Sequence, residues 1–327
     1  MSNYLLHGGI LALAWFLIVN IVMSVAVAAW AARTTSDRSS AGSAALWFAA
    51  RVGPAAAALL FVAGVFVPSY WKYEPRDFVE GFDVTLTALA VLAAGLFVAA
   101  GARGLRAWRS AARRTRVWMR TARPLALAGT CIPAFEIDAD APIMALVGVL
   151  RPRLLVTRGL VAALTDEELA ASVAHEIGHS RARDNLKRLM MRASPDILTA
   201  SSLARTIERR WTSASEHSAD RMAACDSPAA RCALASALVK IARLMPSATP
   251  GLRREGLEPM STLVDGGEIV SRVERLLADP LPLAPKRTPT IAWTGVLAVV
   301  AAVCATSYTP LLQLVHAATE ALVHSLP

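Results

Sequence analysis

The chain has 327 residues, of which 55% are hydrophobic and 18% are charged, and its mean hydropathy is +0.44. Such an apolar chain cannot bury all its side chains in one soluble core, so part of it should face lipid. The same composition excludes a disordered chain, and four cysteines in so long a chain exclude a disulfide-stapled scaffold. The net charge of +9 indicates either nucleic-acid binding or membrane orientation, and the positions of the charges decide between them.

Four apolar stretches are long enough to cross a hydrocarbon core of about 30 Å. No basic residue precedes the first stretch, which is about twice as long as the core of a cleavable signal peptide, so we expect a helix that is retained. The four predicted transmembrane helices are Leu5–Ala32, Val52–Trp71, Val84–Ala102 and Thr290–Tyr308.

The basic residues indicate how these helices are oriented. Eight arginines lie between positions 103 and 123, directly after the third stretch, and no acidic residue occurs between Asp83 and Glu136. By the positive-inside rule, this run lies in the cytoplasm and both termini lie outside. Trp108 and Trp118 are interleaved with the arginines, as in a nucleic-acid-binding patch. Because the run directly follows a membrane helix, contact with anionic lipid headgroups is favoured, and we expect no direct nucleic-acid binding.

The segment after the arginine run has the pattern of a mixed α and β domain. The short apolar runs Ile143–Val149 and Leu154–Thr157 predict a small sheet, and an extended substrate could add a strand to its edge. Thr165 followed three residues later by Glu168 predicts a capping box, which opens a helix.

This predicted helix carries the sequence His175-Glu176-Ile177-Gly178-His179. Residues four apart lie on one helix face, so two imidazoles at this spacing can share one tetrahedral metal ion. Zinc suits imidazole and carboxylate ligands, and Glu176 is close enough to take a proton from a metal-bound water. The motif therefore predicts a catalytic zinc site with His175 and His179 as ligands and Glu176 as the general base.

A catalytic zinc needs a third protein ligand. Metzincins place a histidine six residues after the second motif histidine, but Asn185 stands there, which excludes that class. A downstream carboxylate or histidine remains, and Glu216 is the best candidate. Asp220 follows it at i+4 on a probable helix and would accept a hydrogen bond from a ligand histidine. Asp184, five residues after His179, is a second candidate for this supporting role.

A second donor to the oxyanion would complete the predicted site. His217 and Arg221 are the two candidates, and spacing alone does not choose between them. The tail Leu311–Leu326 is amphipathic, and we expect a helix that lies on the outer membrane surface. In that helix, an apolar stripe would face the membrane and a polar stripe the solvent. The apolar stripe consists of Leu311, Leu314, Val315, Ala318 and Leu322, and the polar stripe of His316, Glu320 and His324. The spacing i, i+4, i+8 of the three polar residues would also suit metal ligands, but the polar face of a surface helix is favoured.

A set of these residues carries a resemblance to a known family. The matching positions are Ala141-Pro142, Gly148, Arg151-Pro152, Leu155 to Gly159, Leu164, Glu168-Leu169, His175-Glu176-x-x-His179, Arg183-Asp184, Glu216-x-x-x-Asp220 and Arg272-Val273-x-Arg275-Leu276-Leu277. The chain resembles the beta-lactam-sensor antirepressor peptidases, the Bla- and Mec-regulator family. The resemblance covers about residues 125–280 and includes the arrangement of three spans before this region and one after it. It is more distantly similar to the HtpX and CAAX-prenyl endopeptidase family.

The resemblance implies one catalytic Zn²⁺ held by His175, His179 and Glu216, with Glu176 as the catalytic base. Together with the spans, it implies a mainly α integral membrane protein with four transmembrane helices. A cytoplasmic α+β zincin-like (gluzincin) metallopeptidase domain would be inserted between the third and fourth helices. We therefore expect three parts: residues 1–123 with three transmembrane helices and the basic juxtamembrane segment, residues 124–285 with the peptidase domain, and residues 286–327 with the fourth helix and the outer tail.

The expected function is that of a zinc-dependent endopeptidase of the bacterial inner membrane, acting on a transcription repressor or a membrane protein in a regulatory role. The alternatives are a housekeeping protease for membrane proteins and a non-catalytic zinc-bearing signalling or scaffold protein. The antirepressor receptors carry a sensor domain after the fourth helix, whereas here only Thr309–Pro327 follow, without a Ser-x-x-Lys motif. We therefore expect a separate sensor protein, or activity without one. Gly95 and Ala99, at small-x-x-x-small spacing, favour a homo-oligomer.

Overall fold

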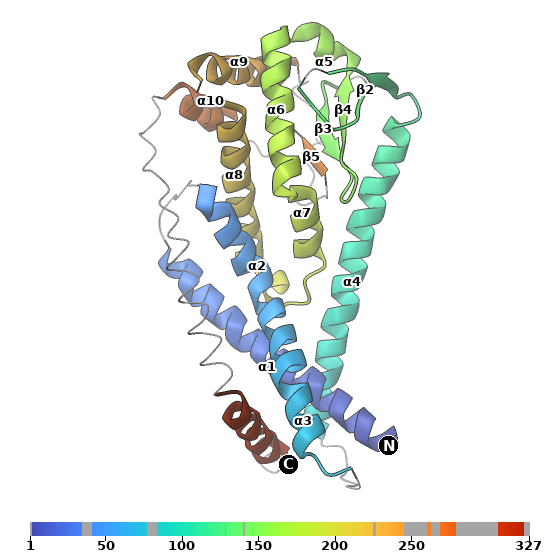
Figure 1. Cartoon of the computed structure of the whole chain (residues 1–327), viewed down its shortest axis with the longest axis vertical. Helices are drawn as coiled ribbons and strands as arrows, with labels where there is room; N and C mark the ends of the chain where they lie inside the picture. The colour runs from blue at the N-terminus through green and yellow to red at the C-terminus, as the bar shows by residue number, and fades with distance from the viewer. Residues whose placement is uncertain are drawn as a thin grey trace.

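A computed structural model gives the structure of the chain, and it describes residues 2–34, 41–76, 84–127, 129–139, 141–224, 227–244, 260–262, 269–278 and 307–323. The long helices α1 (Ser2–Arg33), α2 (Ala41–Phe61) and α4 (Val84–Trp118) make up one end of the molecule. A small sheet and the helix α6 (Asp166–Ala182) lie at the other end, and α4 runs between the two (Figure 1).

Within the part of the chain that the structure describes, three helices are long and apolar enough to cross a membrane: Asn3–Arg33, Ala44–Tyr73 and Val84–Trp118. They coincide with the first three predicted spans, although the second begins earlier than expected. It also contains a π-helical segment, η1 (Val62–Phe66), between α2 and α3 (Val67–Tyr73). The third continues without a break through most of the arginine run, because alanine and arginine are both good helix formers. The fourth predicted span lies outside the described residues, except for its last two positions in the helix 307–323.

The sheet confirms the two predicted apolar runs and adds three strands that were not predicted. Its order is β1-β2-β4-β3-β5, with β2 parallel to β4 and the other pairs antiparallel. The strand β5 pairs with β3, so the outer edge of β3 is already occupied by the chain itself. The strands are β1 (Arg123–Leu125), β2 (Ala134–Ile137), β3 (Met144–Val147), β4 (Arg153–Thr157) and β5 (Met260–Thr262).

Helices complete the domain around the sheet. The predicted capping box is confirmed, since the Thr165 hydroxyl accepts a hydrogen bond from the Glu168 amide and the Glu168 carboxylate accepts one from the Thr165 amide. Apolar residues of the sheet, α6 and α9 form one shared core. The other helices are α5 (Arg158–Ala163), α7 (Asp184–Arg192), η2 (Ile197–Ala200), α8 (Ser202–Ala224), α9 (Pro228–Leu244) and α10 (Ile269–Leu277).

Polar residues from all three apolar helices hold the segment between α7 and α8. Asn20 of α1 donates to the Pro195 carbonyl at 3.1 Å, and Arg103 of α4 donates to the Ser194 carbonyl at 3.0 Å. Arg51 of α2 forms ion pairs with Asp196 at 2.5 Å and with Glu208 of α8 at 2.8 Å. Non-helical backbone can lie among membrane helices only when its amide and carbonyl groups form hydrogen bonds with other parts of the protein. These contacts fix α8 relative to the apolar helices.

Arg51 should be essential for stability, because its side chain is only 2% exposed and binds two carboxylates. Removing one partner of a buried ion pair leaves an uncompensated charge and costs about 3–5 kcal/mol. We expect Arg51→Met to lower the thermal unfolding temperature of the detergent-solubilised protein markedly. Arg33→Met, the same change at the exposed end of α1, should leave it unchanged. Equal unfolding temperatures for Arg51→Met and wild type would show that this ion-pair network contributes no stability.

The C-terminal helix, residues 307–323, packs on the apolar helices instead of presenting the predicted stripe to a membrane surface. The Ser69 hydroxyl donates to the Leu312 carbonyl at 2.7 Å, and the Trp15 indole donates to the Thr319 hydroxyl at 3.1 Å. Leu312, Val315 and Thr319 are buried, whereas Leu311 and Leu314 are 39% and 65% exposed. The helix is rotated relative to the expectation because contacts with α1 and α3, which are distant in sequence, select its buried face.

Candidate metal centre

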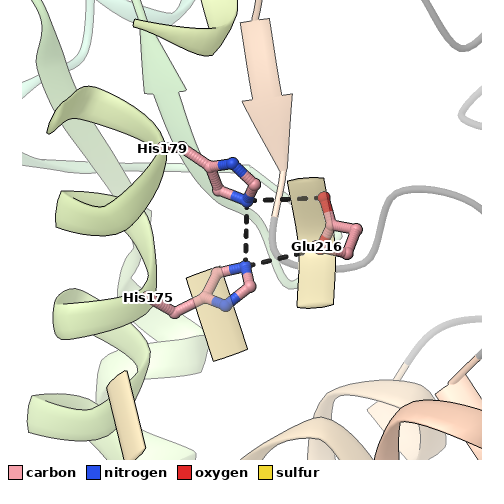
Figure 2. Close-up of side chains that lie close together, drawn as sticks. All are labelled: His175, His179 and Glu216. Carbon is pink, nitrogen blue, oxygen red and sulfur yellow. Dashed lines mark hydrogen bonds and ion pairs between the residues drawn. The ribbon is translucent and has the colours of Figure 1, made fainter. Parts of the chain in front are cut away.

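His175 and His179 of α6 and Glu216 of α8 converge at one point (Figure 2). The two Nε2 atoms lie 3.1 Å apart, and each lies 3.4 Å from an oxygen of Glu216. Both imidazoles are fully buried. Gly178 allows this approach, since a Cβ at this position would lie 3.1 Å from the Ala219 Cα of α8. The helices can therefore approach closely enough for three ligand atoms to meet.

The spacing of these atoms fits a tetrahedral zinc site. With bonds of about 2.0–2.1 Å, the ligand atoms of a tetrahedron lie about 3.3–3.4 Å apart. The three observed separations of 3.1, 3.4 and 3.4 Å are close to this value. Two imidazoles and one carboxylate also form a ligand set that zinc prefers in catalytic sites. The residues present therefore fit a zinc ion with one position left open.

Two aspartates orient the imidazoles. Asp184 Oδ2 lies 2.8 Å from His179 Nδ1, and Asp220 Oδ1 lies 2.9 Å from His175 Nδ1. A carboxylate on Nδ1 favours the tautomer with its proton there, which directs the Nε2 lone pair to the metal position. The one-residue break at Arg183, whose φ is 55°, ends α6 and brings Asp184 back toward His179. The structure thus places Asp184 and Asp220 as the sequence analysis expected.

Arg272 of α10 is the cation that the structure adds to this cluster. Its guanidinium lies 3.0 Å from Glu216 Oε2 and donates to Asp220 Oδ1 at 2.6 Å. Arg272 belongs to a segment that carries the family resemblance, but no role was predicted for it from the sequence. The two predicted oxyanion donors, which directly follow Glu216 and Asp220 on α8, are half-buried (His217) and exposed (Arg221). Burial and the charges of nearby arginines lower the pKa of His217.

Glu176 lies beside the histidines and is fully buried. Neither of its carboxylate oxygens accepts a hydrogen bond from the residues that the structure describes. Burial raises the pKa of this carboxyl, and the neighbouring charges of His179 and His175 only partly oppose the rise. A buried carboxylate without a protein donor is costly unless a water molecule or ligand satisfies it. Its position and raised pKa suit a group that exchanges a proton with a water molecule or substrate.

The charges within the cluster shift the pKa values of His179 and Glu216 in opposite directions. Burial alone would lower the pKa of His179, but the Glu216 carboxylate and the hydrogen bond with Asp184 raise it to about 10. Burial would raise the pKa of Glu216, but Arg272 and His179 hold it well below its ordinary value. Because zinc binds only neutral imidazole, its affinity should fall as the pH falls.

The comparison with protein families gives an independent result for this region. The model of peptidase family M48 matches residues 109–215, which is the segment from the arginine run of α4 to the residue before Glu216. The matched residues include His175, Glu176 and His179, whereas the evidence for Glu216 comes from the geometry of α8. No curated protein matches the chain. The family match supports a metallopeptidase related to family M48.

Proposed function

We propose that the protein is a zinc-dependent endopeptidase of the bacterial inner membrane, which cleaves a cytoplasmic or membrane polypeptide in a regulatory role. The observation that carries this proposal is the buried Glu176 beside the His175, His179 and Glu216 cluster. A purely structural metal site needs no such carboxylate, so Glu176 argues against a non-catalytic zinc-bearing scaffold. The match to peptidase family M48 supports the same reaction class.

The residues of the site divide the chemistry between them. Zinc bound to the three ligands would polarise a peptide carbonyl and lower the pKa of a water molecule toward about 7. Glu176 takes the proton of the attacking water molecule and gives it to the leaving amine. Asp184 and Asp220 hold the imidazoles in the tautomer that binds metal. Arg272 keeps Glu216 ionised and lies close enough to the cluster to donate to the oxyanion, a role we assign to it ahead of His217 and Arg221.

The regulatory role rests on access to the site. His175, Glu176 and His179 are all fully buried, so a substrate reaches them only after a covering segment moves. An extended substrate that adds a strand at β3 would also have to pair beside β5 or replace it. A metal centre that must first be exposed suits the cleavage of one selected substrate. A separate sensor protein or a second copy of the chain would provide the trigger that exposes it. Broad degradation of misfolded membrane proteins would need an open centre.

The three apolar helices support a membrane location. The arginine run at the end of α4 directly precedes the sheet. By the positive-inside rule, this supports a cytoplasmic peptidase region and an N-terminus on the outer side. Residues beside the run would contact anionic lipid headgroups. In this topology the substrates are cytoplasmic polypeptides or membrane proteins exposed at the inner leaflet.

Substrate trapping tests the proposed function. Cells that express Glu176→Gln should accumulate intact substrate bound to the variant, which mass spectrometry identifies, and cells with the wild-type protein should show its new N-terminus. A single cleavage in one protein would support the regulatory role, whereas many unfolded membrane proteins would replace it with quality control. No new N-terminus that depends on Glu176 would overturn the peptidase proposal and favour the scaffold.

A further inference from the structure

A second group of metal-ligand side chains lies far from the peptidase centre. Glu74, directly after α3, and His316 and Glu320 of the C-terminal helix each offer one ligand atom, and these atoms lie within 4.8 Å of one another. The C-terminal helix and α3 are at the end of the molecule opposite to α6 and the sheet (Figure 1). His316 and Glu320 are four residues apart and share one helix face, whereas Glu74 is distant from both in sequence.

The surrounding contacts hold these side chains in position. The His316 ring stacks on the Tyr73 ring with centroids 5.6 Å apart, and His316 Nδ1 lies 3.8 Å from Glu74 Oε2. The Glu74 side chain is only 7% exposed and that of His316 is 28% exposed. Two carboxylates that meet in a partly buried place favour a cation between them. The basic side chains of the same turn, Lys72 and Arg76, lie over the rings of Tyr73 and Trp71.

We propose that Glu74, His316 and Glu320 form a second zinc site, which clamps the C-terminal helix to the end of α3. One imidazole and two carboxylates are a nitrogen and oxygen ligand set that zinc accepts, and water completes the coordination. Ligand atoms around zinc lie about 3.4 Å apart, so the side chains must close by up to about 1.4 Å, which their partial exposure allows. The site is distinct from the peptidase centre and does not depend on the proposed function.

Zinc stoichiometry tests this site in the full-length protein. The protein, in detergent and with a tag that contains no histidine, is dialysed to equilibrium against micromolar free Zn²⁺, and bound zinc is measured per chain. We expect two zinc ions for wild type, one for His316→Gln, one for His179→Ala and none for the double variant. Gln313→Ala, at an exposed position of the same helix, is the matched control and should keep two.

Hydrogen exchange tests the clamp in the His179→Ala variant, which lacks a peptidase-site ligand. If local unfolding of this helix breaks the zinc site, bound zinc slows amide exchange in residues 307–323. The expected factor is 1 + [Zn²⁺]/Kd, which is about 100-fold when the free zinc concentration is 100 times Kd. Glu320→Gln should abolish this slowing. One zinc ion per wild-type chain that His316→Gln keeps would overturn the proposal. Two zinc ions in His316→Gln, or exchange in this helix that zinc does not change, would overturn it as well.

Discussion

Glu176→Gln should reduce kcat by about 10²–10⁴-fold while leaving the zinc content at the peptidase centre unchanged. Glutamine has nearly the same volume as glutamate, and both Glu176 oxygens are buried without a protein donor, so the substitution breaks no hydrogen bond among the described residues. What it removes is the group that accepts and returns the proton. Cleavage of a trapped substrate by purified wild type and variant gives the ratio, and metal analysis of the same samples gives the zinc content.

Glu167→Gln is the matched control, because it makes the same change at an exposed position of α6. It should retain wild-type kcat and zinc content. If Glu176→Gln cleaved the substrate at the wild-type rate, another group would have to be the general base. If it lost zinc as well as activity, the loss of activity would reflect the metal site and not proton transfer.

The geometry of the candidate metal centre was largely predictable because it follows from local helix geometry. The spacing of His175 and His179 places both imidazoles on one face of any helix, and the Thr165 capping box fixes where that helix begins. Glu216 and Asp220 likewise share a face of α8, so one pairing of two helices positions both. The two supporting aspartates could therefore be named before the fold was known.

The features that could not be predicted all depend on contacts between distant segments. Arg272 is 52 residues from Asp220, and no spacing rule indicates that its guanidinium reaches the cluster. Contacts with Ser69 and Trp15 select the buried face of the C-terminal helix. Amphipathicity alone therefore predicted this face only in part, since Val315 is buried but Leu311 and Leu314 are exposed. For the same reason Glu74 could not be paired with His316 and Glu320. The edge of β3 was also expected to be open, but β5 from more than 100 residues later covers it.

Hydrogen bonds and ion pairs connect the apolar helices to the segment before α8, and α8 carries one of the proposed zinc ligands. Asn20, Arg51 and Arg103 each come from a different apolar helix and bind residues 192–196, and Arg51 also binds Glu208 of α8. Glu216 lies two turns further along the same rigid helix. A shift of the membrane helices would therefore move a predicted zinc ligand.

Glu216→Ala should weaken zinc binding at the peptidase centre by more than about 100-fold, because loss of a group that only supports a ligand already costs 10–100-fold. The substitution leaves two imidazoles whose Nε2 atoms lie 3.1 Å apart, and it removes the carboxylate that lies 3.4 Å from each. Asp220→Asn, which changes only the partner of His175, should give the smaller loss. Titration with a zinc-chelator competitor measures all three affinities.

Glu167→Ala provides the matched control, since it removes an exposed carboxylate from α6 and should bind zinc as wild type does. Arg272 keeps its hydrogen bonds to Asp220 in Glu216→Ala, so the guanidinium is not left without a carboxylate. The affinity loss then reports the missing ligand and not a collapsed site. Full zinc affinity with normal activity in Glu216→Ala would remove Glu216 from the centre and require another residue as the third ligand.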